Sequence, residues 1–465
     1  MKESILKSIQ FSHREPIGSS TYPAPNDVPK REDITRRLDE RSTPFPNSTL
    51  YVHIPFCDQI CSFCGFNKAV SSEPVKERYI SALLDEIERY GRKPYVQSLN
   101  IDAVYIGGGT PNSLNANQIG RLLQAIRRFL PIAEGVEITC EGIVQNFDTE
   151  RCDALKHGGV NRISAGIQTF NRDIREAHLH MRNGADELLL GIEKMQSHFE
   201  NINLDMIYNL PGQTDEIWAD DMRMVLQTGV QHLTVYPLVL LENTIFFADY
   251  VKNKKFPVPD ENREIEMYRS ALAQIENSPY TNRYSVRDWA KPGRDCRYIR
   301  MNAESNHILA LGAGSHGYLA GFTYRSIRST VKYMEFIEQN PGELPIDGIK
   351  LTTERERMQR FAVMGLRMRD LDLAPFQTRF GSPFLDVFEK QVSELTANGY
   401  LMLNGNRLNF TDKGDIWANN VRTYFEGEVG RTVGYTDTVS VGEDGKTHYS
   451  KITRIKASGD VEANV

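Results

Sequence analysis

The stretch YVHIPFCDQICSFCGFNK, residues 51–68, decides the fold and the chemistry that the rest of the sequence predicts. This stretch contains Cys57, Cys61 and Cys64 within a span of eight residues, in the spacing CxxxCxxC. The other three cysteines stand singly in the sequence. The apolar run LYVHIP comes directly before them and predicts a strand that ends near the first cysteine. We therefore expect the three thiols in one loop at a strand end.

Three hypotheses account for these thiols. Unpaired structural cysteines usually occur singly, so this clustering disfavours that hypothesis. A structural zinc site takes four ligands, usually from paired CxxC knuckles, and the sequence has no second pair. The third hypothesis, which we favour, is a [4Fe–4S] cluster held by three thiolates inside an aromatic shell of Phe56, Phe63 and Phe66. One iron then stays open for a substrate or cofactor, so the site would be catalytic.

The composition is that of an ordinary globular protein. The 465 residues carry a net charge of −6, with 40% hydrophobic and 25% charged side chains. This mildly acidic balance argues against nucleic-acid and membrane partners. No apolar run approaches the ~20 residues that span a bilayer, and the first residues lack the apolar core of a secretion signal. We expect a cytoplasmic monomer.

Short apolar runs alternate with longer helical patterns between residues 50 and 239. The runs are LYVHIP, DAVYIGGG, VEITCEG, RISAGIQ, INLDMIYNLP and HLTVYPLVL. Segments such as VKERYISALLDEIERYG, with apolar residues three and four apart, separate them. Six such units predict an α/β fold, a partial (β/α)6 barrel of the TIM type. Its site is expected at the carboxyl ends of the strands.

The remaining sequence predicts further parts around this barrel. Two helical segments followed by LMLNGNRLNF predict a small, winged-helix-like C-terminal domain with a tight hairpin. A second hairpin is expected around Asp444-Gly445. The expected organisation is an N-terminal arm (1–48), the barrel core (49–240), a barrel extension that contributes to the substrate region (241–350), the C-terminal helical domain (351–427) and a polar tail (428–465).

CxxxCxxC after a first barrel strand is the signature of the radical S-adenosylmethionine (SAM) superfamily. The version in residues 51–68 resembles that of the oxygen-independent coproporphyrinogen III oxidases, the HemN-like family. The resemblance, from the arm segment SSTYPAP to about residue 425, implies a [4Fe–4S] cluster whose open iron binds SAM. Reductive cleavage of that SAM gives a 5′-deoxyadenosyl radical. A small-molecule substrate and an electron donor such as flavodoxin or ferredoxin are also implied.

The resemblance assigns cofactor-binding residues strand by strand. GGGTP matches the family's glycine motif, which places backbone N–H groups near SAM. Polar residues follow on the later strands, and aromatic residues pack around the cluster. His180 takes the place of a family arginine, which Arg182 could replace, and Pro237 follows the tyrosine of the sixth strand. The residues assigned to the SAM region are Tyr51, Phe63, Gly108, Gly109, Thr110, Glu141, Gln168, His180, Arg182, Asp205 and Pro237.

Two stretches bear on the reaction. LALGAGSHG resembles the family's second-SAM stretch, with His316 in place of an aliphatic residue. EGIVQNF, residues 141–147, departs from the oxidases and resembles the anaerobic haem-degrading and other class C radical SAM methyltransferases. Our leading hypothesis is therefore methyl transfer or carbon insertion from a second SAM into an unsaturated tetrapyrrole or heteroaromatic substrate. Oxidative decarboxylation of coproporphyrinogen III and a haem chaperone are the alternatives.

Several single residues carry competing interpretations. His316 is either a packed residue or a group that contacts the second SAM and acts as a catalytic base. His53 is expected to hold the cluster loop. Tyr284 and Trp289 line the substrate mouth or belong to the core. Cys140 is expected to be a small buried hydrophobic residue, although it precedes Glu141.

Overall fold

The computed structural model describes residues 9–11, 14–15, 21–41, 48–257, 259–304, 306–427, 439–441 and 447–449. The chain divides into two compact units. Residues 25–352 form the larger unit, and residues 1–24 with 353–465 form the smaller one. Every residue that the sequence assigns to the site belongs to the larger unit.

The six predicted strands are present in the expected order. They are β1 (Ser48–Ile54), β2 (Ile101–Gly108), β3 (Ile132–Gly142), β4 (Arg162–Gln168), β5 (Ile202–Tyr208) and β6 (His232–Pro237). Each pairs in parallel with the next along the chain. Their carboxyl ends therefore meet at one edge, which confirms the predicted parallel α/β core.

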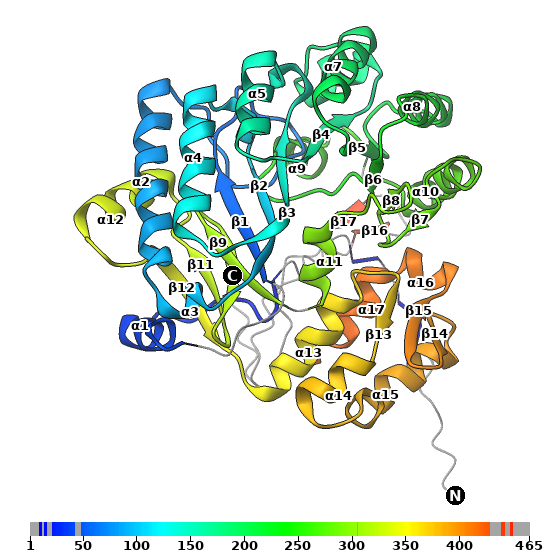
Figure 1. Cartoon of the computed structure of the whole chain (residues 1–465). Helices are drawn as coiled ribbons and strands as arrows, with labels where there is room; N and C mark the ends of the chain where they lie inside the picture. The colour runs from blue at the N-terminus through cyan, green and yellow to red at the C-terminus, as the bar shows by residue number, and fades with distance from the viewer. Residues whose placement is uncertain are drawn as a thin grey trace, which may run out of the picture. The chain divides into compact units, whose positions relative to one another are not determined.

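Helices cover the outer face of these strands (Figure 1). They are α2 (Glu73–Gly91), α4 (Ala116–Phe129), α5 (Thr149–His157), α7 (Ala185–His198) and α8 (Asp215–Gln227). α4 shows why such a segment is helical: Asn115 and Gln118 form a capping box at its start. Its buried Ile119, Leu122 and Ile126 follow at the spacing of one helix face. No helix in the described part of the chain is long and apolar enough to cross a membrane.

Strand alternation divides each strand between two environments. On β1, Leu50, Val52 and Ile54 are fully buried and face the helices. Tyr51 and His53 alternate with them and face the interior of the curved sheet. The other strands follow the same pattern, so polar side chains collect inside the barrel, where they hydrogen-bond to one another.

The sheet continues on both sides of the six strands, so the barrel is open. β9 (His307–Leu311) pairs in parallel with β1, opposite β2. The antiparallel strands β10 (His316–Leu319), β11 (Phe322–Ser326) and β12 (Ile346–Leu351) follow it. β8 (Asp288–Ala290) and β7 (Asn282–Arg283) extend the sheet beyond β6. Helices α10 (Glu261–Glu276), α11 (Arg297–Ala303) and α12 (Thr330–Gln339) belong to this part.

The smaller unit is mainly helical, as predicted. α13 (Glu354–Gly365), α14 (Ala374–Phe380) and α15 (Phe384–Ala397) precede a hairpin of β14 (Leu401–Asn404) and β15 (Arg407–Phe410). Phenylalanines fill its core; the rings of Phe376 and Phe384, for example, lie 5.1 Å apart. β16 (Val439–Val441) pairs with β17 (Thr447–Tyr449), but the predicted turn at Asp444-Gly445 lies outside the described residues.

Candidate functional site

The cluster loop, residues 55–68, follows β1 and carries the three clustered cysteines. The Cys57 N–H donates to the Ala69 carbonyl at 3.0 Å, and the Ala69 N–H donates to the Pro55 carbonyl at 2.7 Å. These bonds close the two ends of the loop on each other. All three thiols are free; Cys57 is buried, whereas Cys61 and Cys64 are partly buried.

The electrostatics of the cluster loop favour a bound cationic centre. Burial raises the pKa of Cys57 to about 11 and that of Cys61 to about 12, and charge on neighbouring cysteines adds to both shifts. Burial also raises the pKa of Cys64. Three thiolates in this position are therefore unfavourable alone, whereas a metal centre deprotonates its thiol ligands. The donor set fits an iron–sulfur cluster.

The arrangement of the donors does not support a single-ion zinc site. Within the described ranges, no three His, Cys, Asp or Glu side chains are grouped closely enough to hold one metal ion. In a [4Fe–4S] cluster each thiolate binds a different iron, so its ligands need not crowd around one ion. The placement of Cys57, Cys61 and Cys64 in one loop is compatible with a cluster of this kind.

The first glycine loop, residues Gly107–Thr110, packs directly on the cluster loop. Gly108 has φ +121°, and a Cβ there would lie 2.7 Å from the His53 ring. A Cβ on Gly109 would lie 2.9 Å from Cys57 Sγ and 2.8 Å from the Phe56 carbonyl oxygen. The Thr110 N–H donates to that same carbonyl at 2.7 Å. Only glycine fits these close approaches.

Glu141, at the end of β3, lies over the first glycine loop. A Cβ on Gly107 would be 2.7 Å from its Oε2, and the Gly108 N–H bonds to its carboxylate. Burial, with a further contribution from Asp205, raises the pKa of Glu141 to about 8. A cationic ligand group beside this carboxylate would favour its charged form. Glu141 is therefore suited to hold an ammonium group.

Asp205 and Gln168 extend the site across β4 and β5. Burial raises the pKa of Asp205 to about 6, and Asn203 Nδ2 donates to its Oδ1 at 2.8 Å. Gln168 has a left-handed backbone, φ +70°, and its Oε1 accepts from the Tyr236 hydroxyl at 3.4 Å. The predicted polar residues of the third, fourth and fifth strands thus meet at one edge.

Aromatic and histidine side chains connect β1 to the cluster loop. Asn67 O can only accept, so His53 Nε2 donates to it at 2.8 Å. His53 Nδ1 then accepts from the Tyr51 hydroxyl at 3.0 Å. His53 holds the cluster loop, as predicted. Phe63 packs, with Cys61, against the apolar cluster that includes Ile207, Leu238 and Phe246.

In the segment after β4, the basic side chain that points inward is Arg175. The sequence had indicated His180 and Arg182 instead. His180 and Arg182 are exposed, and their assignment to SAM stays a prediction. Arg175 is instead fully buried, and donates to Thr169 O at 3.1 Å and Asn183 O at 2.7 Å. Arg175 therefore fixes the loop after Gln168. Sequence reasoning missed it, because nothing in REAHLHMRNG distinguishes it from its exposed neighbours.

The last two assigned residues lie in later strands. Pro237 is buried at the end of β6, but the preceding Tyr236 is the residue that reaches Gln168. His316 is exposed at the start of β10. The surrounding protein, followed by the charges of Arg325 and Arg328, lowers its pKa to about 4. His316 is therefore a neutral imidazole near pH 7.

Three residues with open interpretations lie in the core. Tyr284 and Trp289 are 3% and 2% exposed, and the Tyr284 hydroxyl bonds to His232 Nε2 at 2.7 Å. They are core aromatics and do not line a mouth. Cys140 is buried, and burial raises the pKa of its thiol. It is a small hydrophobic residue, as expected.

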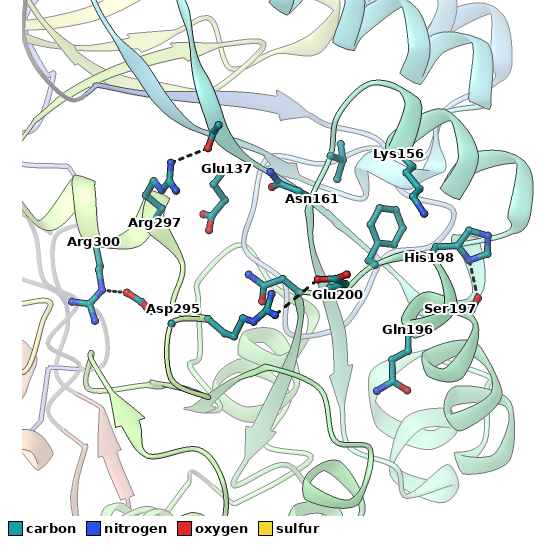
Figure 2. A pocket seen from close by; sticks show the side chains of 16 residues that line it. Glu137, Lys156, Asn161, Gln196, Ser197, His198, Glu200, Asp295, Arg297 and Arg300 are labelled. Atoms are coloured by element: carbon teal, nitrogen blue, oxygen red, sulfur yellow. Dashed lines mark hydrogen bonds and ion pairs between the residues drawn. The ribbon is translucent and has the colours of Figure 1, made fainter.

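A pocket of about 840 Å³ lies at the opposite, amino edge of the strands (Figure 2). None of the predicted site residues lines it. Two ion pairs join charged side chains of its lining: Arg294 faces Glu200 at 3.9 Å, and Arg300 bonds to Asp295. This pocket is separate from the carboxyl-edge site.

Asp221→Ala is expected to destabilise the carboxyl edge. The Asp221 carboxylate, on α8, accepts from Thr169 Oγ1 and Phe170 N, each at 2.7 Å, and from Gln213 Nε2 at 3.1 Å. Loss of these buried bonds should cost about 3 kcal/mol and lower Tm by about 5 °C or more. Asp220→Ala is the matched control, since that side chain is 66% exposed. Equal Tm values for the two variants in a thermal melt would contradict the prediction.

Known proteins share both parts of this architecture. The model of the radical SAM superfamily matches residues 51–225, and that of the HemN C-terminal domain matches residues 352–416. The structure of coproporphyrinogen III oxidase HemN from Escherichia coli superposes with a TM-score of 0.75 at 23% identity. It covers 88% of this chain and 97% of that chain, which shows a common fold.

Two relatives are similar in sequence over most of their length. The heme chaperone HemW of Lactococcus lactis subsp. lactis is 30% identical over 382 residues, 81% of this chain and 96% of the relative. The anaerobilin synthase of Escherichia coli O157:H7 is 29% identical over 377 residues, 80% of this chain and 82% of the relative. With the cysteine loop and the open barrel described above, these matches place the chain in the HemN-like family of the radical SAM superfamily.

Proposed function

We propose that the chain is a radical SAM enzyme that transfers a methyl-derived carbon from a second SAM molecule to an unsaturated tetrapyrrole or heteroaromatic substrate. The observation that carries the proposal is a contact between the cluster loop and the second glycine loop, residues Gly312–His316. Asn67 Nδ2 donates to the Ala313 carbonyl at 2.9 Å, and a Cβ on Gly314 would lie 2.7 Å from that Nδ2. Two loops suited to close ligand approach thus lie side by side.

Membership of the superfamily brings a [4Fe–4S] cluster and SAM. When bound, these cofactors supply a 5′-deoxyadenosyl radical. Cys57, Cys61 and Cys64 would hold the cluster. Glu141 would hold the ammonium group of SAM, which relieves the cost of its buried carboxylate. Asp205 would accept hydrogen bonds from hydroxyl groups of the nucleoside.

The segment EGIVQNF supports methyl transfer over decarboxylation. It continues from Glu141 into a short turn, where Asn146 Nδ2 donates to Asp58 Oδ2 at 2.5 Å. Asp58 belongs to the cluster loop, so the segment that distinguishes the chain from the oxidases contacts the loop that would hold the cluster. The similarity to an anaerobilin synthase also favours this function.

A haem chaperone is the second candidate, because several relatives carry that name. Anaerobic incubation of reconstituted protein with methyl-labelled SAM, a low-potential reductant and haem separates the candidates. The proposal expects 5′-deoxyadenosine, S-adenosylhomocysteine and label in the tetrapyrrole. Haem bound stoichiometrically but recovered unchanged, with neither SAM product, would overturn the proposal in favour of the chaperone. With coproporphyrinogen III as substrate, carbon dioxide and 5′-deoxyadenosine without label transfer would favour decarboxylation.

His316→Ala is expected to separate radical formation from carbon transfer. His316 is an exposed imidazole at the end of the second glycine loop, where its ring can accept a proton released from the substrate. We expect labelled product to fall about 100-fold, while 5′-deoxyadenosine formation changes little. His157→Ala, an exposed histidine on α5, is the control. A parallel loss of both products, or no loss of either, would remove the assignment of His316 as a base.

A further inference from the structure

Two fully buried side chains of α2 reach the second glycine loop. Glu86 Oε2 accepts from the Gly312 N–H at 2.8 Å. The Tyr79 hydroxyl accepts from the Ala313 N–H at 3.0 Å and donates to the His53 carbonyl at 2.8 Å. Two consecutive N–H groups of the second glycine loop are therefore held from α2.

The burial of the Glu86 carboxyl group is energetically unfavourable. The residue is 0% exposed, and Tyr333 on α12 is the other donor to its Oε2, at 2.5 Å. Within the described residues its Oε1 has no hydrogen-bond partner. Burial raises the pKa of Glu86 to about 7, although the bonds from Tyr333 and Gly312 oppose the shift. An apolar side chain would fill this space at lower cost, so the bond to the loop is the specific contribution of Glu86.

The second glycine loop is also fixed from its other side. Gly312 has φ +89°, and a Cβ there would lie 2.5 Å from the His53 carbonyl oxygen. Asn67 of the cluster loop bonds to the Ala313 carbonyl. The loop is thus held between α2 and the cluster loop, and its backbone has little freedom to adjust to a ligand.

We propose that Glu86 is a positioning residue for the second SAM molecule: by holding the Gly312 N–H, it fixes the second glycine loop at the distance from the cluster loop that the second ligand requires. This inference rests on the proposed function. It assigns no contact between Glu86 and SAM, because Glu86 acts through the loop.

The test is SAM binding to the reconstituted protein by equilibrium dialysis with labelled SAM. The wild type is expected to bind a second SAM beyond the one at the cluster. Glu86→Leu removes the acceptor of the Gly312 N–H and should raise the Kd of the second event about tenfold or more. The change that SAM causes in the EPR spectrum of the reduced cluster should stay as in the wild type. Glu77→Leu, on the same helix and paired with Arg121 at the surface, is the matched control.

Tyr333→Phe provides a second variant in case Glu86→Leu folds poorly. It removes one donor to Glu86 and leaves the bond to Gly312, so we expect a smaller rise in the second Kd. A wild type that binds a single SAM would overturn the proposed function itself. Second-site affinities equal to the wild type in both variants would overturn only the role of Glu86. Equal weakening of both SAM events would show a general structural effect and would also overturn it.

Discussion

Replacement of Cys57, Cys61 or Cys64 singly by alanine is expected to abolish SAM cleavage. Each thiolate binds a different iron, so the loss of one leaves an iron without its protein ligand in a buried loop. We expect iron and sulfide per chain to fall sharply, the broad visible absorbance of the cluster to disappear, and 5′-deoxyadenosine to fall below about 1% of the wild-type yield. Iron analysis and anaerobic turnover measure these effects.

The chain contains its own controls for this experiment. Cys140, Cys152 and Cys296 are also free and are more deeply buried than Cys61 and Cys64. Their replacement by alanine removes a small buried side chain but no iron ligand, so cluster content should stay at the wild-type level even where Tm falls. Loss of iron from Cys152→Ala as severe as from Cys61→Ala would contradict the assignment of ligands.

Gly109→Ala is expected to have the second largest effect, although it adds a single methyl group. That methyl would lie 2.9 Å from Cys57 Sγ and 2.8 Å from the Phe56 carbonyl oxygen. The carbonyl belongs to the backbone and cannot move aside by changing a rotamer, so the cysteine and its loop must shift. Overpacking of this kind costs about 1–3 kcal/mol. We expect at least half of the cluster to be lost on reconstitution and SAM binding to weaken with it.

Gly120→Ala is the control for Gly109→Ala. A Cβ on Gly120 would meet no atom within 4 Å, and the residue lies inside α4. Alanine in a helix is more favourable than glycine by up to about 1 kcal/mol, so Tm should stay the same or rise. Wild-type cluster content and SAM affinity in Gly109→Ala would show that the close contact between the two loops is not needed.

The sequence was sufficient for the six parallel strands and for the group formed by Glu141, Gln168 and Asp205. Short apolar runs that alternate with helical patterns specify a parallel sheet, and the carboxyl ends of parallel strands meet at one edge. Once the strands were known, the polar residues that end them had to come together. The cluster loop could also be predicted, because the spacing CxxxCxxC comes directly after an apolar run that indicates a strand.

The strand order after residue 280 could not be predicted from the sequence in this way. β9 to β12 are short and mostly antiparallel, and their order in the sheet is set by long-range pairing with β1. Nothing in HILAL predicts a parallel partner more than 250 residues away. Whether a basic side chain turns inward is likewise a matter of loop geometry, so Arg175 could not be distinguished from His180 and Arg182.

Glu86 could have been found from the sequence. Tyr79, Leu83 and Tyr90 are all buried on α2. Glu86 lies three residues after Leu83 and four before Tyr90, on the same stripe of the helix. A carboxyl group on an apolar stripe indicates a buried partner. The partner itself, a backbone N–H of the second glycine loop, could be identified only from the fold.

The place of β1 within the sheet has a consequence for oxidative damage. β1 is paired on one side with β2, which leads into the first glycine loop, and on the other with β9, which leads into the second. Oxygen that destroys the iron–sulfur cluster would release the cluster loop. Both glycine loops pack near this loop, the first against His53 and the second against Asn67. Amide hydrogen exchange should then quicken at Gly107–Thr110 and Gly312–His316 together. Air exposure would thus loosen two distant stretches of the chain at once, and reconstitution should protect them both again.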